Sequence, residues 1–169
     1  PAHMRNGGAH KDYQTIAGDF DGDGKTDLAT ISKNGGGGWA DWIAIERSTG
    51  GGVASAAWLA PTPAHMRNGG AVADYVVDPG DFDGDGRTDL ATVSRNGGAG
   101  WADWIAVELS TGAGFSSRTW AAATPAHMRN GGSHKDYVVI PGDFDGDGRT
   151  DLATVTKNGG GGWGDWIAV

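Results

Sequence analysis

Short apolar runs rich in β-branched residues alternate along the chain with polar, glycine-rich segments. In the first part of the chain these runs occupy residues 13–17, 27–32, 39–47 and 53–59. In the run 39–47, large apolar residues occur at both alternating sets of positions, which is typical of a strand covered on both faces. No segment sustains the 3.6-residue apolar period of an amphipathic helix. The pattern predicts four short β-strands and an all-β fold.

The whole pattern returns with a period of 62 residues. The octapeptide PAHMRNGG marks each return, beginning at Pro1, Pro63 and Pro125. We therefore divide the chain into repeats 1–62, 63–124 and 125–169, about 2.7 repeats in all. The third repeat lacks the counterpart of the last 17 residues of the first. Four short strands per unit are typical of a β-propeller blade, which is the predicted architecture, although a solenoid or a stack of small sandwiches has a similar strand pattern.

The number of predicted blades is too small for a closed ring. Propellers close with about 4–8 blades, and the chain encodes fewer than three complete ones. Isolated blades would expose apolar faces and unpaired strand edges. We therefore expect either a longer polypeptide or self-association, most simply two chains that close a ring of six blades.

Composition and charge narrow the class of protein. The 169 residues include 32 glycines and no cysteine, which excludes a disulfide scaffold and a thiolate zinc site. The formal net charge of −8 argues against a nucleic-acid partner. No apolar run reaches the roughly 18 residues of a membrane span, so we expect no membrane insertion. Because the chain begins with proline rather than methionine, we expect a processed or excised product, secreted to the extracellular space, whose signal segment has been removed.

An aspartate-rich loop follows the first predicted strand of every repeat. In DFDGDGKTD the carboxylates stand at positions 1, 3, 5 and 9, Gly24 permits a sharp turn, and the carbonyl at position 7 would point inward. The predicted metal ligands are Asp19, Asp21, Asp23, the Lys25 carbonyl and Asp27; Asp81, Asp83, Asp85, the Arg87 carbonyl and Asp89; and Asp143, Asp145, Asp147, the Arg149 carbonyl and Asp151. This hard, all-oxygen set favours Ca²⁺ over zinc or copper, and Mg²⁺ ranks second because it demands tighter octahedral geometry.

Two other interpretations of these loops fit less well. An EF-hand needs a glutamate at position 12 and flanking helices, whereas position 12 here is Thr30, Thr92 or Thr154 within a β-like run. A metal-free turn is possible because Asp and Gly are favoured turn residues. However, four carboxylates within nine residues repel one another strongly without a cation. We therefore predict about one structural Ca²⁺ per repeat.

The loop sequences DFDGDGKTDLA and, twice, DFDGDGRTDLA resemble the calcium loops of integrin-α-like propeller repeats, the FG-GAP and VCBS class. The G-x-G-Val/Phe-x-Ser-x-x-Trp stretches at Gly50 and Gly112 are similar, more loosely, to blade ends of mushroom and bacterial propeller lectins. The chain departs from the first class in lacking a clean Phe-Gly…Gly-Ala-Pro segment and in carrying an insertion before Trp39. The resemblance implies a structural calcium ion in each blade and, for the lectins, sugar pockets between blades.

Two further segments, residues 3–8 and 39–42 of the first repeat, recur almost letter for letter in the later repeats. Residues 9–17 and 51–57, in contrast, vary between copies. They combine tryptophan faces, on which a sugar ring can stack, with side chains that hydrogen-bond hydroxyl groups. The candidate ligand-binding residues are His3, Arg5, Asn6, Trp39, Asp41 and Trp42; His65, Arg67, Asn68, Trp101, Asp103 and Trp104; and His127, Arg129, Asn130, Trp163, Asp165 and Trp166. Alternatively, the tryptophans fill the space between blades and Arg5 pairs with Asp41 without any ligand.

The motifs of common enzymes are absent from the sequence. It contains no Gly-x-Ser-x-Gly, no His-Glu-x-x-His and no phosphate-binding glycine loop, and 12 of its 21 acidic residues lie in the aspartate loops. We therefore predict a protein that is not an enzyme. The preferred function is a secreted, calcium-stabilised propeller lectin that binds glycans multivalently. The alternatives are a non-catalytic structural or adhesion scaffold that binds protein partners and, less favoured, an accessory domain of a larger secreted hydrolase.

Overall fold

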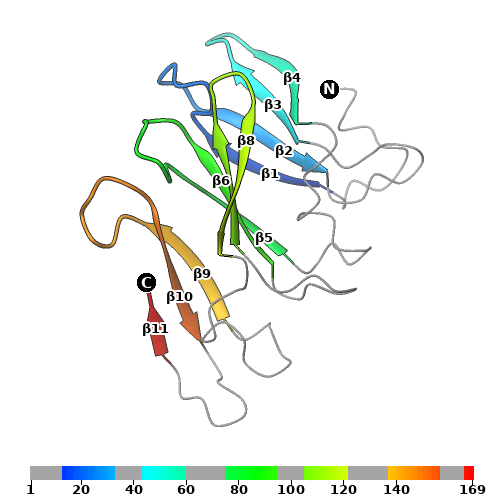
Figure 1. Cartoon of the computed structure of the whole chain (residues 1–169). Coiled ribbons are helices and arrows are strands. Elements are labelled where there is room, and N and C mark those ends of the chain that lie inside the picture. Colours follow the sequence, from blue (N-terminus) through cyan, green and yellow to red (C-terminus); the bar gives the residue numbers. More distant parts are fainter. Residues whose placement is uncertain (1–12, 33–42, 60–74, 95–104, 122–136, 157–165) are drawn as a thin grey trace.

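The computed structural model describes residues 13–32, 43–59, 75–94, 105–121, 137–156 and 166–169. These residues form three antiparallel sheets (Figure 1). The first sheet contains β1 (Tyr13–Gly18), β2 (Asp27–Ser32), β3 (Ile43–Ser48) and β4 (Val53–Leu59). The second contains β5 (Tyr75–Gly80), β6 (Asp89–Ser94), β7 (Ile105–Ser110) and β8 (Phe115–Ala121). The third contains β9 (Tyr137–Gly142), β10 (Asp151–Thr156) and β11 (Trp166–Ala168).

The predicted strands are confirmed, with small shifts at their ends. β2 and β4 have the predicted bounds, and β1 and β3 each extend one residue further at the carboxyl end. The start predicted for the third strand, residues 39–42, lies outside the described residues. Within the described ranges no helix occurs, and hence none that could cross a membrane.

Each sheet is an up-and-down meander in which neighbouring strands are consecutive in the sequence. The register places Gly18 opposite Asp27 at one end of the first sheet and Tyr13 opposite Ser32 at the other. The aspartate loops therefore close one end of the sheets, and the β2–β3 and β4–β5 connections leave from the other. Since the second sheet repeats the pairing of the first, the two are successive copies of one blade-like unit.

The hydrophobic core lies between neighbouring sheets. Ile16, Phe20 and Ile31 of the first sheet pack in one buried cluster with Val77 and Leu90 of the second. The second and third sheets meet in the same way through two smaller clusters. Because the opposite faces of the second sheet contact different neighbours, its central strands β6 and β7 are buried on both sides, whereas β8 at its edge is largely exposed. The chain has a propeller-like all-β fold in which the sheets stack side by side (Figure 1).

Candidate metal centre

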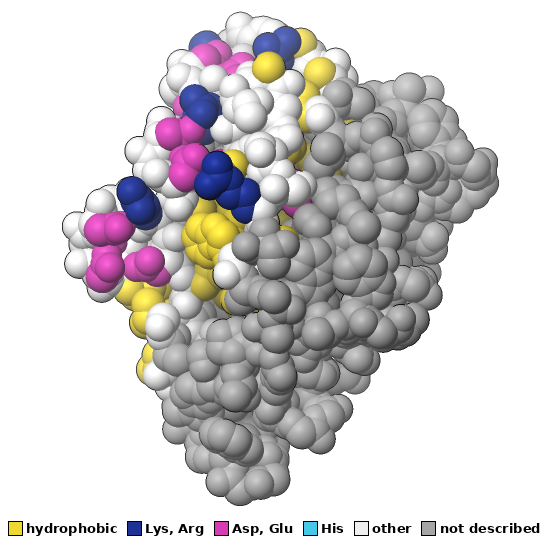
Figure 2. Space-filling model, viewed as in Figure 1, with side chains coloured by type: hydrophobic (Ala, Val, Ile, Leu, Met, Phe, Trp, Pro, Cys, Tyr) yellow, Lys and Arg dark blue, Asp and Glu magenta, His cyan; other side chains and the backbone are white. Residues whose placement is uncertain are grey.

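The three aspartate loops lie along one edge of the molecule. They connect β1 to β2, β5 to β6 and β9 to β10, and they project in the same direction in Figure 1. In the space-filling view of Figure 2, acidic side chains gather at each loop, with lysine and arginine side chains between them. The 62-residue repeat therefore places one acidic loop per sheet along this edge of the molecule.

Backbone hydrogen bonds to the first aspartate shape each loop. Asp19 Oδ1 accepts hydrogen bonds from the Gly22 and Asp23 amides at 2.8 and 3.1 Å, and its Oδ2 accepts one from the Gly24 amide at 2.8 Å. Gly22 and Gly24 have φ angles of 79° and 81°, in the left-handed region that residues with a Cβ atom rarely adopt. The glycines thus let the chain curl around one carboxylate, which requires the Asp-x-Asp-Gly-Asp-Gly spacing.

The curled loops bring carboxylates together. In each loop three carboxylates offer oxygen atoms that all lie within 4.8 Å of one another. The clusters are Asp19, Asp21 and Asp27; Asp81, Asp83 and Asp85; and Asp143, Asp145 and Asp151.

Oxygen atoms this close together can reach one hard cation, since the oxygen ligands of Ca²⁺ or Mg²⁺ lie about 2.0–2.6 Å from the ion. A carboxylate oxygen that accepts an amide hydrogen bond keeps a second lone pair for a metal. The donor set therefore suits a hard cation that prefers oxygen ligands.

The last aspartate of the loop is a buried anchor. Asp89 is fully buried, and its two oxygens accept hydrogen bonds from the Phe82 amide at 2.9 Å and the Ser110 amide at 2.7 Å. The pKa of Asp89 is raised to about 6, mainly by burial and also by the charges of Asp83 and Asp85, against the lowering effect of these two hydrogen bonds. A cation beside this group would offset both the burial and the repulsion.

The third aspartate of the loop has a basic partner. Asp23 Oδ2 accepts a hydrogen bond from Lys25 Nζ at 2.6 Å, which lowers the pKa of Asp23. In the second loop Asp85 pairs with Arg87 in the same way. Asp23 is not part of the first carboxylate cluster, whereas Asp85 belongs to the second. The four-carboxylate ligand set predicted for each loop is thus represented by three carboxylates.

The first two loops are each also hydrogen-bonded to the loop of the next repeat. The Asp19 amide donates to Thr88 Oγ1 at 3.0 Å, and the Thr88 amide donates to the Asp19 carbonyl at 2.7 Å. The same pair of bonds, 2.9 and 2.7 Å long, joins Asp81 to Thr150. We call this two-bond contact the threonine clamp. It links the start of one aspartate loop to the end of the next, across the boundary between sheets.

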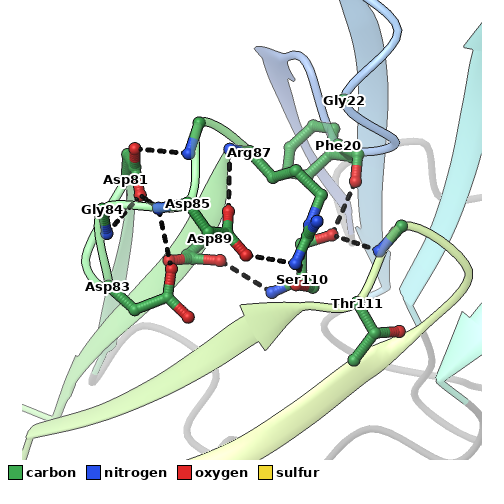
Figure 3. A network of polar contacts seen from close by, with 12 residues as sticks. Phe20, Gly22, Asp81, Asp83, Gly84, Asp85, Arg87, Asp89, Ser110 and Thr111 are labelled. Atoms are coloured by element: carbon green, nitrogen blue, oxygen red, sulfur yellow. Dashed lines mark hydrogen bonds and ion pairs between the residues drawn. The ribbon is translucent and has the colours of Figure 1, made fainter.

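A second set of contacts strengthens this boundary (Figure 3). Ser110 Oγ donates a 2.5 Å hydrogen bond to the carbonyl of Phe20 in the preceding loop. The Arg87 side chain, whose Nε donates to the Ser110 carbonyl at 3.1 Å, lies beside Gly22 of that loop. A Cβ atom on Gly22 would lie only 3.1 Å from Arg87 Cγ, so the glycine allows the arginine to approach. The aspartate loop of one repeat is therefore part of the interface with the next.

The clamp predicts a specific loss of stability. We expect Thr88→Val, which removes the hydroxyl and keeps the shape, to lower the free energy of unfolding by about 1–2 kcal/mol, because the Asp19 amide loses its acceptor. Denaturant unfolding of the dilute chain would measure the change. The same substitution at the exposed counterpart Thr26 is the control, with an expected change below about 0.5 kcal/mol. Equal effects at the two positions would contradict a role for the clamp.

The family comparison covers most of the chain. The FG-GAP-like repeat matches residues 19–92 and, overlapping with these, residues 81–154. The chain belongs to the FG-GAP-like repeat family. The two matches begin at the first aspartates of successive loops and are offset by one 62-residue period. No curated protein and no solved structure matches the chain significantly.

The FG-GAP-like assignment confirms the resemblance expected from the aspartate loops and leaves the relation to lectins a prediction. The candidate ligand-binding residues, from His3 to Asp165, lie outside the described residues, and only the backbone of Trp166, in β11, is described. The sequence reasoning missed the threonine clamp. The residues of the clamp do recur, since every loop begins Gly-Asp and ends Thr-Asp, but the recurrence does not show that they meet.

Proposed function

We propose that this FG-GAP-like chain is a secreted, non-catalytic, calcium-stabilised binding module that recognises glycans multivalently. The proposal that the chain binds calcium rests on the cluster of three carboxylates in each loop, whose oxygens lie within 4.8 Å of one another. Three Ca²⁺ ions would add six positive charges to a formal net charge of −8 and leave −2. The ions would thereby relieve most of the repulsion within the chain.

The role proposed for calcium is structural. The ligand Asp19 contributes its side chain to the carboxylate cluster and its backbone to the threonine clamp. An ion that fixes the loop would also fix the atoms that hold the next sheet. Asp27 accepts hydrogen bonds from two backbone amides, and Asp23 and Asp85 are paired with Lys25 and Arg87, so these carboxylates are engaged in holding the loops. These features support stabilisation rather than catalysis.

The proposed glycan sites belong at the opposite end of the sheets. The register places the ends of β2 and β4 beside the starts of β1 and β3. In the sequence, the candidate segments 3–6 and 39–42 precede the starts of β1 and β3, and both starts lie at the end of the first sheet away from the aspartate loop. In the second repeat, the starts of β5 and β7 lie at the corresponding end. The tryptophan, arginine, asparagine and aspartate of these segments are side chains expected in a sugar pocket.

A glycan array with a tryptophan variant tests this function. We expect sugar-inhibitable binding, and we expect the triple variant Trp42→Ala, Trp104→Ala, Trp166→Ala to bind at least about tenfold more weakly, because each pocket loses its stacking surface. Trp120→Ala is the matched control, since this half-exposed tryptophan on β8 is not a candidate ligand-binding residue. The control should keep wild-type affinity.

The outcome also separates the two proposed functions. No binding across the array by the folded, calcium-loaded chain would reject the lectin and favour a scaffold that binds protein. If the triple variant unfolds, the tryptophans belong to the core. If it remains folded and binds sugar as well as the control, they do not form the site.

A further inference from the structure

Equivalent residues differ in exposure according to whether a neighbouring sheet covers them. Leu90 of the second sheet is fully buried against the first, whereas its counterpart Leu28 is 40% exposed. On the opposite face, Phe20 is fully buried and its third-repeat counterpart Phe144 is 49% exposed. The first and third sheets therefore each carry one apolar face that an adjacent repeat covers elsewhere in the same molecule. We call these the leading face (first sheet) and the trailing face (third sheet).

Each face also carries one partner of the polar contacts that join successive sheets within the chain. On the leading face, Thr26 occupies the position from which Thr88 and Thr150 hold the preceding loop. On the trailing face, Asp143 occupies the position of Asp19 and Asp81, the residues held. Both are exposed. Each face thus carries the half of a threonine clamp that the other face lacks.

The trailing face has free space at the position where, in the other repeats, a basic side chain of the following repeat packs. A Cβ atom at Gly22 or Gly84 would contact the arginine of the following repeat at 3.1 or 3.3 Å, whereas a Cβ atom at Gly146 would meet nothing within 4 Å. Lys25 of the leading face is the counterpart of those arginines. Similarly, Ser48 is the counterpart of Ser110, which donates its hydroxyl to the preceding loop. The two faces are complementary at each of these positions.

We propose that the trailing face of one chain binds the leading face of a second copy, using the contacts that join successive sheets within the chain. In this interface Thr26 of one copy clamps Asp143 of the other, and Leu28 packs against the sheet that carries Phe144. The binding is head-to-tail, so it continues until the chain of copies closes on itself. Closure with two copies gives six sheets, within the range of about 4–8 that propellers contain. The interface requires neither sugar binding nor an enzymatic activity.

The native mass of the intact chain is the first test. We expect light scattering or native mass spectrometry to give a discrete species of two 17.3 kDa chains, or of another small whole number of chains. A folded wild-type chain that remains at 17.3 kDa at about 100 μM, with and without Ca²⁺, would overturn the proposal.

Two variants block opposite halves of the interface. Leu28→Asp places a charge on the leading face, and Gly142→Val places a side chain where Gly18 and Gly80 leave no space beside the threonine of the next sheet. Each should weaken association about 100-fold or more, because a buried apolar contact is lost or the clamp cannot close. Ser116→Asp, at an exposed position of β8, is the control and should assemble normally. Circular dichroism would verify that every variant is folded.

Mixing the two variants tests the head-to-tail geometry. The Leu28→Asp chain keeps its trailing face and the Gly142→Val chain keeps its leading face, so an equimolar mixture should form a 1:1 dimer through one intact interface. Neither variant alone should form this dimer. If the folded variants assemble as well as wild type, or if the mixture stays monomeric, the proposed interface is wrong.

Discussion

Removal of calcium is expected to lower the melting temperature of the chain substantially. A ligand that binds only the folded state at 100 times its dissociation constant stabilises that state by about 2.7 kcal/mol per site. For a chain of this size, each kcal/mol corresponds to about 2–4 °C in Tm. Each occupied loop should therefore raise Tm by about 5–11 °C. Differential scanning fluorimetry in 10 mM CaCl₂ and in excess EDTA would measure the difference.

The ionic control for this experiment is MgCl₂ at the same concentration. Magnesium should recover only a small part of the stabilisation, because Mg²⁺ demands near-ideal octahedral geometry and gives up its water ligands reluctantly. Asp21→Asn, within the first carboxylate cluster, should lose one site's share of the effect. Equal Tm values in calcium and EDTA would contradict the structural-calcium proposal, and equal effects of the two cations would show general charge screening instead.

The second large effect is expected at a glycine in the boundary between sheets. Gly80→Ala should lower the free energy of unfolding by about 1–3 kcal/mol, because overpacking of a filled interior costs that much. The added Cβ atom would lie 2.5 Å from Thr150 Cγ2 and 2.7 Å from Thr150 Cβ, so the clamp or the sheets must shift. Chemical denaturation in a concentration range where the chain is monomeric would measure the loss.

The chain supplies a matched control for this substitution. Gly142 occupies the same position in the third repeat, where an added Cβ atom would meet only the Phe144 ring, at 3.2 Å. That ring is half exposed and can move aside. Gly142→Ala should therefore change stability by less than about 0.5 kcal/mol. A loss as large as that at Gly80 would show that the cause is the glycine's backbone rather than its contact with threonine.

The parts of the fold that sequence predicted are local. Strand positions followed from short apolar runs, and the loop followed from glycines at the positions where the structure has positive φ angles. Both depend on residues within one repeat. Asp19 and Thr88, in contrast, are 69 positions apart, and no pattern within a single repeat shows that they meet. The repeat made the sheets predictable but not the contacts between them.

The composition of the aspartate loop was predicted more accurately than the roles of its individual aspartates. Spacing alone treated the aspartates of a loop as equivalent ligands. In the structure, Asp27 is buried and accepts hydrogen bonds from two backbone amides, whereas Asp23 lies at the surface with Lys25. This division depends on which side of the loop faces the sheet, a three-dimensional property that the one-dimensional spacing does not contain.

The threonine clamp has a consequence for how such chains can change in length. Each repeat brings one threonine that holds the loop before it and one aspartate that is held by the sheet after it. Duplication or deletion of a whole 62-residue unit therefore keeps both partners of the threonine clamp at every remaining junction. Stability then depends mainly on each unit and its nearest neighbours, as in other repeat proteins. A gene that gains or loses a copy by recombination would encode a chain whose units can still be joined by this clamp.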